Sequence, residues 1–156
     1  MKKILLALFL LASCSMTTDK GVISGKVISV ADGDTMTILT AEKKQIKIRL
    51  QGIDAPERGQ DFGTVARQQL NNLCYGKTVT VENKGEDQYG RVLGVVYIDG
   101  MNVNEYMVRN GLAWYYRHFV NDARLDSLEQ LARQEKVNIW SMKNPMPPYE
   151  YRKSKR

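Results

Sequence analysis

The chain has 156 residues, enough for one domain with a single core. Lysine and arginine outnumber aspartate and glutamate by 23 to 17, a moderate excess of positive charge that suits a polyanionic partner. Two cysteines and one histidine are too few for a disulfide framework or for a zinc or copper site built from these side chains.

Residues 1–13 have the pattern of an export signal. Lys2 and Lys3 precede an apolar run over residues 4–12, which is too short to span a bilayer because a spanning helix needs about 20 apolar residues. Small residues then lead to Cys14, which resembles a bacterial lipoprotein signal cleaved just before a lipidated cysteine. We therefore expect a lipid anchor at Cys14 in a membrane of the bacterial cell envelope, with residues 14–20 as a tether. The alternative is an ordinary secretory signal in which Cys14 is incidental.

Alternating apolar residues and turn dipeptides predict five strands, and apolar residues at helical spacing predict three helices. The strands are expected over residues 22–30, 35–40, 45–53, 78–82 and 92–98, and the helices over 63–74, 103–110 and 121–136. Five strands with helices between and after them suit an α+β fold built on a small closed barrel. Residues 143–156 combine prolines with clustered cations and show no periodicity, which predicts a basic disordered tail.

Two acidic turns flank the third expected strand. One carries Asp32 and Asp34, the other carries Asp54 and Glu57, and the strand between them carries Arg49. The first turn alone is adequately explained as a simple Asp-Gly turn. With the second turn following so closely, carboxylates without histidine favour a site for a hard cation such as calcium, magnesium or manganese. Asp34 and Asp54 are the candidate ligands.

The motifs along the chain resemble those of the staphylococcal nuclease family over residues 21–142. They are DGDT at 32–35, IRLQGIDAPE at 48–57, DQYGR at 87–91, VNE at 103–105, RNGLA at 109–113 and NIW at 138–140. The resemblance implies an OB-fold barrel. It also implies a metal-dependent nuclease, with calcium ahead of magnesium or manganese, which hydrolyses phosphodiester bonds in DNA or RNA with little sequence preference. Whether cleavage is internal or from an end stays open.

The resemblance also assigns roles to single residues. It implies that the backbone carbonyl of Ala55 completes the metal ligands, that Asp32 acts through a water molecule, and that Glu57 orients or deprotonates the attacking water. Arg49 and Arg91 would hold the phosphate, although an arginine beside acids is more often a surface ion pair. The residues expected to contact substrate are Tyr89 and Gln88, the latter standing where the family prototype has a lysine.

Two further departures concern side chains near the substrate. Ala55 replaces a threonine and loses its hydroxyl but keeps the carbonyl. The prototype's two base-stacking tyrosines have no counterparts in register, although Tyr115, Tyr116 and Phe119 lie nearby in sequence. Those three aromatic residues could equally stack on bases or pack in the core.

A catalytically silent OB-fold module that binds single-stranded nucleic acid is the main alternative. A silent module would have no need of Arg49, Glu57 and Arg91 together with both candidate ligand aspartates, so the enzyme is favoured. A purely structural lipoprotein leaves the acidic turns unexplained. No protein partner is evident, and we expect a monomer.

Overall fold

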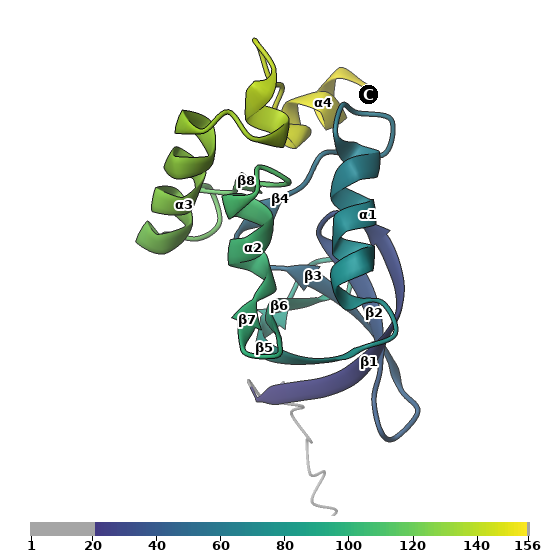
Figure 1. Cartoon of the computed structure of the whole chain (residues 1–156). Coiled ribbons are helices and arrows are strands. Elements are labelled where there is room, and N and C mark those ends of the chain that lie inside the picture. Colours follow the sequence, from purple (N-terminus) through teal and green to yellow (C-terminus); the bar gives the residue numbers. More distant parts are fainter. Residues whose placement is uncertain (1–20, 156) are drawn as a thin grey trace, which may run out of the picture.

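The computed structural model describes residues 21–155. The expected signal, Cys14 and the tether lie outside these residues. Five strands form the barrel. In the view of Figure 1 the helices lie above it. The strands are β1 (Val22–Asp32), β2 (Thr35–Leu39), β3 (Gln45–Leu50), β5 (Thr78–Glu86) and β6 (Val92–Ile98). Among the described residues, no helix is both long enough and apolar enough to cross a membrane.

The barrel closes where β3 and β6 pair in parallel. Along the sheet the strands run in the order β3, β2, β1, β5, β6, with antiparallel pairing between neighbours. The closing ladder pairs Ile48 with Val92 and Leu50 with Gly94. The fully buried Ile48 and Leu50 show that the alternation in residues 45–51 was interpreted correctly, and the predicted five-stranded OB-fold barrel of the α+β class is confirmed.

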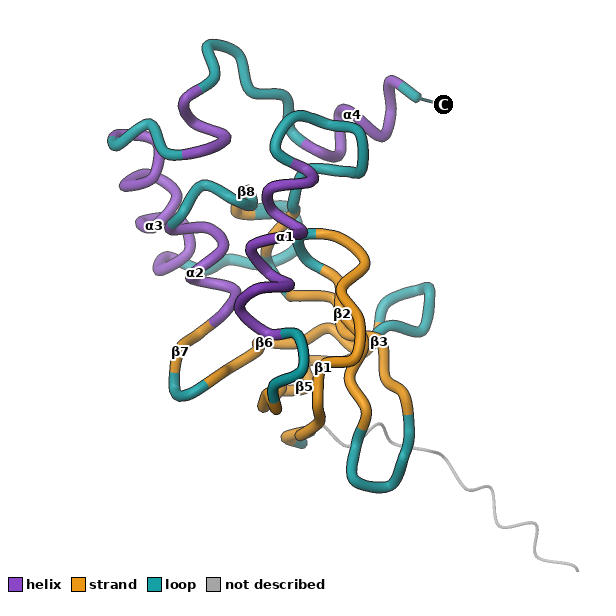
Figure 2. Tube along the Cα trace, turned by 45° about the vertical axis from the view of Figure 1, so that its right-hand side comes forward, coloured by secondary structure: helices purple, strands orange, loops and turns teal. Residues whose placement is uncertain are grey.

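Shorter elements decorate the barrel. β7 (Met101–Asn102) pairs antiparallel with the end of β6, and β4 (Ile53–Asp54) pairs with β8 (Trp114–Tyr115). The helices are α1 (Gly63–Cys74), α2 (Val103–Arg109), α3 (Ala123–Gln134) and α4 (Pro148–Ser154), with a 3-10 turn, η1 (Asn138–Ser141), before α4. Figure 2 shows these helices, in purple, grouped on one side of the orange strands.

α4 corrects the prediction of a disordered tail at residues 143–156, and the described residues hold four α-helices rather than three. Pro148 occupies the first turn, where its fixed φ suits a helix and its missing N–H costs nothing. It is also the only residue of α4 that is buried. The helix is held mainly by charged and aromatic contacts, so the apolar periodicity that would have revealed it is absent.

Buried polar contacts fix α2 against the closing seam. The side chain of Asn104 accepts a hydrogen bond from the backbone N–H of Val96 (3.0 Å) and donates to the carbonyls of Gln51 (2.9 Å) and Gly94 (3.1 Å).

At the C-terminal end of α1, burial raises the pKa of the Cys74 thiol to about 11. Cys74 is fully buried, so it packs in the core rather than acting as a reactive thiol.

Candidate active site

The two acidic turns meet at one end of the barrel. Gly33 lies in the first turn, and a Cβ there would come within 2.7 Å of the side chains of Ala55 and Ala66. Gly63, which begins α1, lies so close to the carbonyl of Glu57 that any side chain would overlap it. Only glycine allows this approach at either position, so the packing of the turns against α1 fixes where their carboxylates point.

Asp34 and Asp54 converge on a single nitrogen of Arg49. The Nη2 atom of Arg49 lies 3.2 Å from Oδ2 of Asp34 and 3.3 Å from Oδ1 of Asp54. Oδ2 of Asp34 also accepts a hydrogen bond from the backbone N–H of Ala55 (2.7 Å), which ties the two turns together directly. Both carboxylates are buried, with Asp54 only 2% exposed. The structure therefore brings together the two aspartates predicted as metal ligands.

Arg49 is more enclosed than the sequence suggested. Its Nη1 atom donates to the carbonyls of Leu50 (2.8 Å) and Ile53 (2.9 Å), and its side chain is only 13% exposed. In this conformation Arg49 orders the aspartates and the link between β3 and β4. Contact with a phosphate would require the guanidinium to turn outward.

Asp32 lies beside the pair. Its Oδ1 atom accepts a hydrogen bond from the backbone N–H of Asp34 (3.1 Å). Burial and the neighbouring Asp34 charge raise the pKa of Asp32 to about 7. Burial also raises the pKa of Asp54, against the opposing effect of Arg152. Both shifts are caused mainly by burial, with the charge of Asp34 adding to them, so a cation beside these carboxylates would stabilise their charged forms.

The donor set is compatible with a hard cation, although it is small. Within residues 21–155, no three histidine, cysteine, aspartate or glutamate side chains are grouped as a metal site. The available donors are the carboxylates of Asp34 and Asp54 with backbone carbonyls such as that of Ala55, all of them oxygen. Oxygen donors suit calcium or magnesium, with water filling the remaining positions. The aspartates already attract two guanidinium groups, so the site favours positive charge.

The second of these guanidinium groups, from Arg152 on α4, was missed from the sequence. Its Nη1 atom lies 2.6 Å from Oε1 of Glu57 and 3.1 Å from Oδ1 of Asp54, and its Nη2 atom lies 3.1 Å from Oδ2 of Asp54. Burial alone would lower the pKa of Arg152, but these contacts outweigh burial and hold the pKa above its ordinary value. The only sequence signal was the cluster of cations near the end of the chain.

Arg91 is linked to Asp34 indirectly, through Thr35. Its Nε atom pairs with Oδ2 of Asp87 (2.7 Å), and Nη1 donates to the hydroxyl of Thr35 (3.4 Å). That hydroxyl donates to Oδ1 of Asp34 (3.1 Å), so Thr35 links Arg91 to the buried carboxylate. Asp87 and Thr35 are therefore two further site residues that the sequence reasoning did not select.

The turn before Arg91 presents the two residues predicted to contact substrate. Tyr89 is 71% exposed and its ring centre lies 5.5 Å from the guanidinium of Arg91. Gln88 is exposed on the same turn. Both side chains are thus accessible beside a cation, as a nucleotide contact requires.

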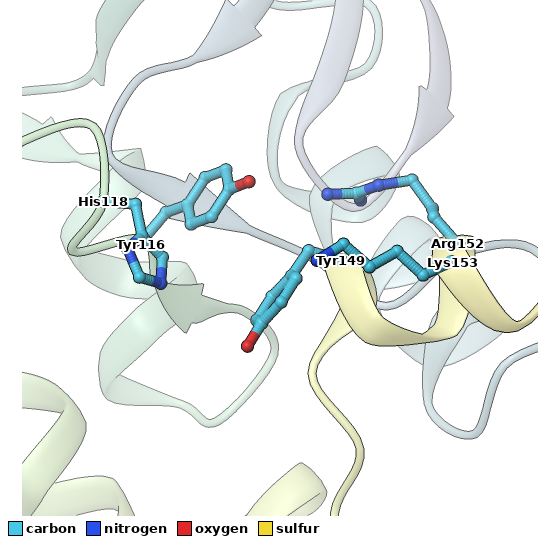
Figure 3. A pocket seen from close by; sticks show the side chains of 5 residues that line it. All are labelled: Tyr116, His118, Tyr149, Arg152 and Lys153. Atoms are coloured by element: carbon cyan, nitrogen blue, oxygen red, sulfur yellow. The ribbon is translucent and has the colours of Figure 1, made fainter.

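A cavity of about 500 Å³ opens next to Arg152 (Figure 3). Tyr116 and His118, from the loop after β8, face Tyr149 and Lys153 of α4 across it. A smaller cavity of about 140 Å³ shares Tyr116, His118 and Tyr149 with the first and reaches Asp54. The two cavities therefore share a wall that leads towards the carboxylates.

The three aromatic residues left open by the sequence separate in the structure. Tyr115 is buried, and its hydroxyl donates to the carbonyl of Val120 (2.7 Å). Tyr116 lines both cavities, whereas Phe119 is largely exposed and packs on the Tyr116 ring at 4.7 Å. Tyr115 is therefore a core residue, and Tyr116 is the one placed to meet a ligand.

Comparison with known proteins identifies the family. Residues 47–142, more than half of the chain, match the family described as "Staphylococcal nuclease homologue". The chain belongs to the staphylococcal nuclease family. An "Uncharacterized endonuclease" of Escherichia coli is 46% identical over 134 residues, covering 85% of this chain and 87% of that protein. A "Micrococcal nuclease" of Shigella flexneri is 39% identical over 141 residues, covering 83% and 80% respectively.

The match extends to plants. A "Staphylococcal-like nuclease" of Arabidopsis thaliana is 42% identical over 113 residues, covering 72% of this chain but only 35% of that protein. The family and these relatives make the chain a nuclease, a hydrolase of phosphodiester bonds whose substrate is nucleic acid. Asp34 and α4 lie outside the residues matched by the family model.

Proposed function

We propose that this nuclease depends on a divalent cation, with calcium preferred, and that it cleaves DNA and RNA with little sequence preference. The observation that carries the proposal is the convergence of buried Asp34 and Asp54 on one nitrogen of Arg49, with Glu57 at their edge. Buried carboxylates this close together need a cation. Bound beside a phosphodiester, a divalent ion would neutralise charge on the phosphate.

The carboxylates of Asp34 and Asp54 and the carbonyl of Ala55 would hold the cation, and Asp32 would act through a water molecule. Calcium is favoured because it accepts irregular sets of oxygen ligands, whereas magnesium demands nearly octahedral geometry. Two carboxylates from separate turns, together with a backbone carbonyl, form an irregular set of this kind.

Glu57 is proposed as the general base. Its side chain is 35% exposed, so water can reach it, and it lies next to Asp54 through their shared contact with Arg152. A carboxylate in this position can orient a water molecule and accept its proton. The buried aspartates are less suited to this role because their oxygens already accept hydrogen bonds from Arg49 and Ala55.

Arg91 and Arg49 are proposed to have different roles in the reaction. Arg91 is proposed to bind the phosphate, because a guanidinium fork matches two phosphate oxygens and Tyr89 lies beside it for a nucleotide contact. Gln88, on the same turn, is proposed as a second, uncharged contact. Arg49 is proposed to hold the aspartates first and to turn towards the phosphate when another cation balances their charge.

The silent nucleic-acid-binding module stays as a second candidate because of one observation. In the described conformation Arg152 pairs with Glu57 and Asp54, both of which the reaction needs. A protein in which this pairing were permanent would bind nucleic acid without cleaving it.

A digestion experiment tests both candidates. The protein from Gly21 onward would be incubated with single- and double-stranded DNA and RNA in calcium, magnesium, manganese or a chelator. We expect cleavage of all four substrates in calcium, less in magnesium and none in the chelator. Full activity in the chelator would contradict the metal site, whereas calcium inhibition of a magnesium-driven reaction would contradict only the choice of ion. Binding without cleavage in every cation would favour the silent module.

We further propose that the protein is exported and lipid-anchored at Cys14. The support is the basic, apolar and small-residue order of residues 1–14. Full-length protein should fractionate with membranes, and Cys14→Ser should release it; an unchanged distribution would contradict the anchor.

A further inference from the structure

The contacts of Arg152 are incompatible with the reaction proposed above. Its two terminal nitrogens contact both oxygens of Asp54, and one of them also contacts Oε1 of Glu57. A cation held by Asp54 would lie next to this guanidinium, and like charges repel strongly where little water screens them. The same contact occupies Oε1 of Glu57, an oxygen that would otherwise be available to hold the attacking water. For the reaction to proceed, Arg152 must leave.

α4 is attached to the rest of the molecule in a way that allows Arg152 to leave. The helix has seven residues, and helices this short are not stable alone in water. Pro148 is its one buried residue, and the segment before it is held by a hydrogen bond from Nε2 of Gln60 to the carbonyl of Met146 (2.7 Å). Figures 1 and 2 both place α4 beside the loop before α1. Elements with so little burial belong to the part of a protein that opens most easily.

The guanidinium also has room to move. The cavity of about 500 Å³ adjoins Arg152, and the rings of His118 and Tyr149 meet edge to face across it at 6.0 Å. A change of side-chain rotamer could carry the guanidinium into this cavity while Pro148 stays packed. Displacement of Arg152 therefore does not require the barrel or α1 to unfold.

We propose that α4 is an autoinhibitory latch, in which Arg152 competes with a divalent cation for Asp54 and keeps Glu57 paired until the cation binds. This inference rests on the proposed function for the identity of the competing ligand. It goes further in that it assigns a regulatory role to a helix outside the residues matched by the family model. In the metal-free protein the guanidinium of Arg152 keeps the site inactive. The concentration of the divalent cation then sets the fraction of protein molecules in which Arg152 has left the site.

Calcium binding measured by calorimetry tests the latch. The protein would be used from Gly21 onward, which contains every described element of the fold, as the parent, as Arg152→Gln and as Arg124→Gln. Arg124, on α3, is a matched control because its ion pair is with Glu105 on α2 and involves none of the site residues. The apparent affinity of a site that is open for only part of the time is reduced by the open fraction, so Arg152→Gln should bind calcium at least roughly tenfold more tightly than the parent. Arg124→Gln should bind like the parent.

Thermal unfolding gives a second readout that does not depend on activity. In a chelator, Arg152→Gln should melt below the parent because Asp54 and Glu57 lose a cation. In saturating calcium the two should melt at about the same temperature, because the metal replaces that charge and binding to the folded state stabilises it. If Arg152→Gln is too unstable to purify, Arg152→Lys keeps the charge but cannot contact both oxygens of Asp54 through two nitrogens, and should bind calcium with intermediate affinity.

Three results would overturn the latch. Equal calcium affinity in the parent and Arg152→Gln would remove the competition. A lower melting temperature in both chelator and calcium would show a purely structural ion pair. Unchanged calcium affinity with slower cleavage at saturating calcium would make Arg152 a substrate contact instead. Absence of calcium, magnesium and manganese binding in every variant would refute the proposed metal dependence and the latch with it, whereas the first three results leave the proposed function intact.

Discussion

Within residues 21–155, two buried carboxylates are each held by two arginines. Glu129 on α3 is 0% exposed and accepts hydrogen bonds from the backbone N–H of Tyr115 (3.1 Å), from Nη1 of Arg117 (3.3 Å) and from Nε of Arg133 (2.8 Å). Asp54 is 2% exposed and is contacted by Arg49 and Arg152. Burial and charge alone do not distinguish the two clusters.

What distinguishes them is how the arginines are held. Arg133 lies one turn beyond Glu129 on the same helix, and its guanidinium lies 3.6 Å from the ring centre of Trp140 and 4.9 Å from that of Trp114. Arg152 is 98 residues from Asp54 in the chain and sits on a short helix with one buried residue. A buried carboxylate is therefore structural when its cation is fixed by packing, and available for chemistry when its cation can leave.

A large effect on turnover should come from Arg91, which is linked to the cluster that can open through Thr35 and Asp34. Arg91→Ala removes the guanidinium proposed to stabilise charge on the phosphate in the transition state. Loss of a positioned charge donor typically lowers turnover by about 10²–10³-fold. Steady-state kinetics should show that loss in kcat with most of the nucleic-acid affinity kept. A parent-like kcat would show that Arg91 is only the partner of Asp87.

Glu129→Ala should affect stability rather than catalysis. Removing one partner of a buried ion pair costs about 3–5 kcal/mol, and the lower end is expected because Arg117 and Arg133 both reach solvent. Urea unfolding should show a free energy of unfolding lower by about 3 kcal/mol, with calcium affinity unchanged in the folded protein. A loss of unfolding free energy below about 1 kcal/mol, or an altered calcium affinity, would show that the Glu129 cluster is not purely structural and so does not differ from the Asp54 cluster as proposed.

The smallest effect is expected at Thr35, which joins Arg91 to Asp34. Thr35→Val keeps the shape but removes one hydroxyl that donates to Asp34 and accepts from Arg91. A typical hydrogen bond contributes about 0.5–1.5 kcal/mol. We expect the free energy of unfolding to fall by about 1 kcal/mol and turnover to fall by less than about tenfold. A turnover loss as large as that of Arg91→Ala would make the hydroxyl part of the reaction.

The sequence predicts those parts of the molecule whose determinants are local. Alternation within strands places Ile48 and Leu50 in the core, and turn chemistry with glycine explains how Asp34 and Asp54 come together. Periodicity works less well on α3, where helical spacing alone would put Leu131 in the apolar stripe with Leu125 and Leu128. Leu131 is 42% exposed while Glu129 is buried, because the arginines and the backbone of Tyr115 make burial of a charge favourable there.

α4 is the part that local reasoning could not reach. Its contact with Asp54 spans most of the chain, and a helix with one buried residue carries no apolar stripe. Nothing near Arg152 in the sequence distinguishes it from its cationic neighbours. Such a contact is visible only in the folded structure, where Asp54 and the C-terminal helix lie together.

The central claim is that Glu57 and the neighbouring aspartates form a site for chemistry rather than a structural cluster. Single-turnover cleavage of a labelled oligonucleotide in saturating calcium tests it directly. The parent and Glu57→Gln are compared with the same fraction of the oligonucleotide bound to protein. Losing a general base typically lowers the rate by about 10²–10⁴-fold. We predict a loss in that range, with the oligonucleotide Kd and the unfolding midpoint close to those of the parent. A Glu57→Gln variant that binds and cleaves at the parent's rate would contradict the account.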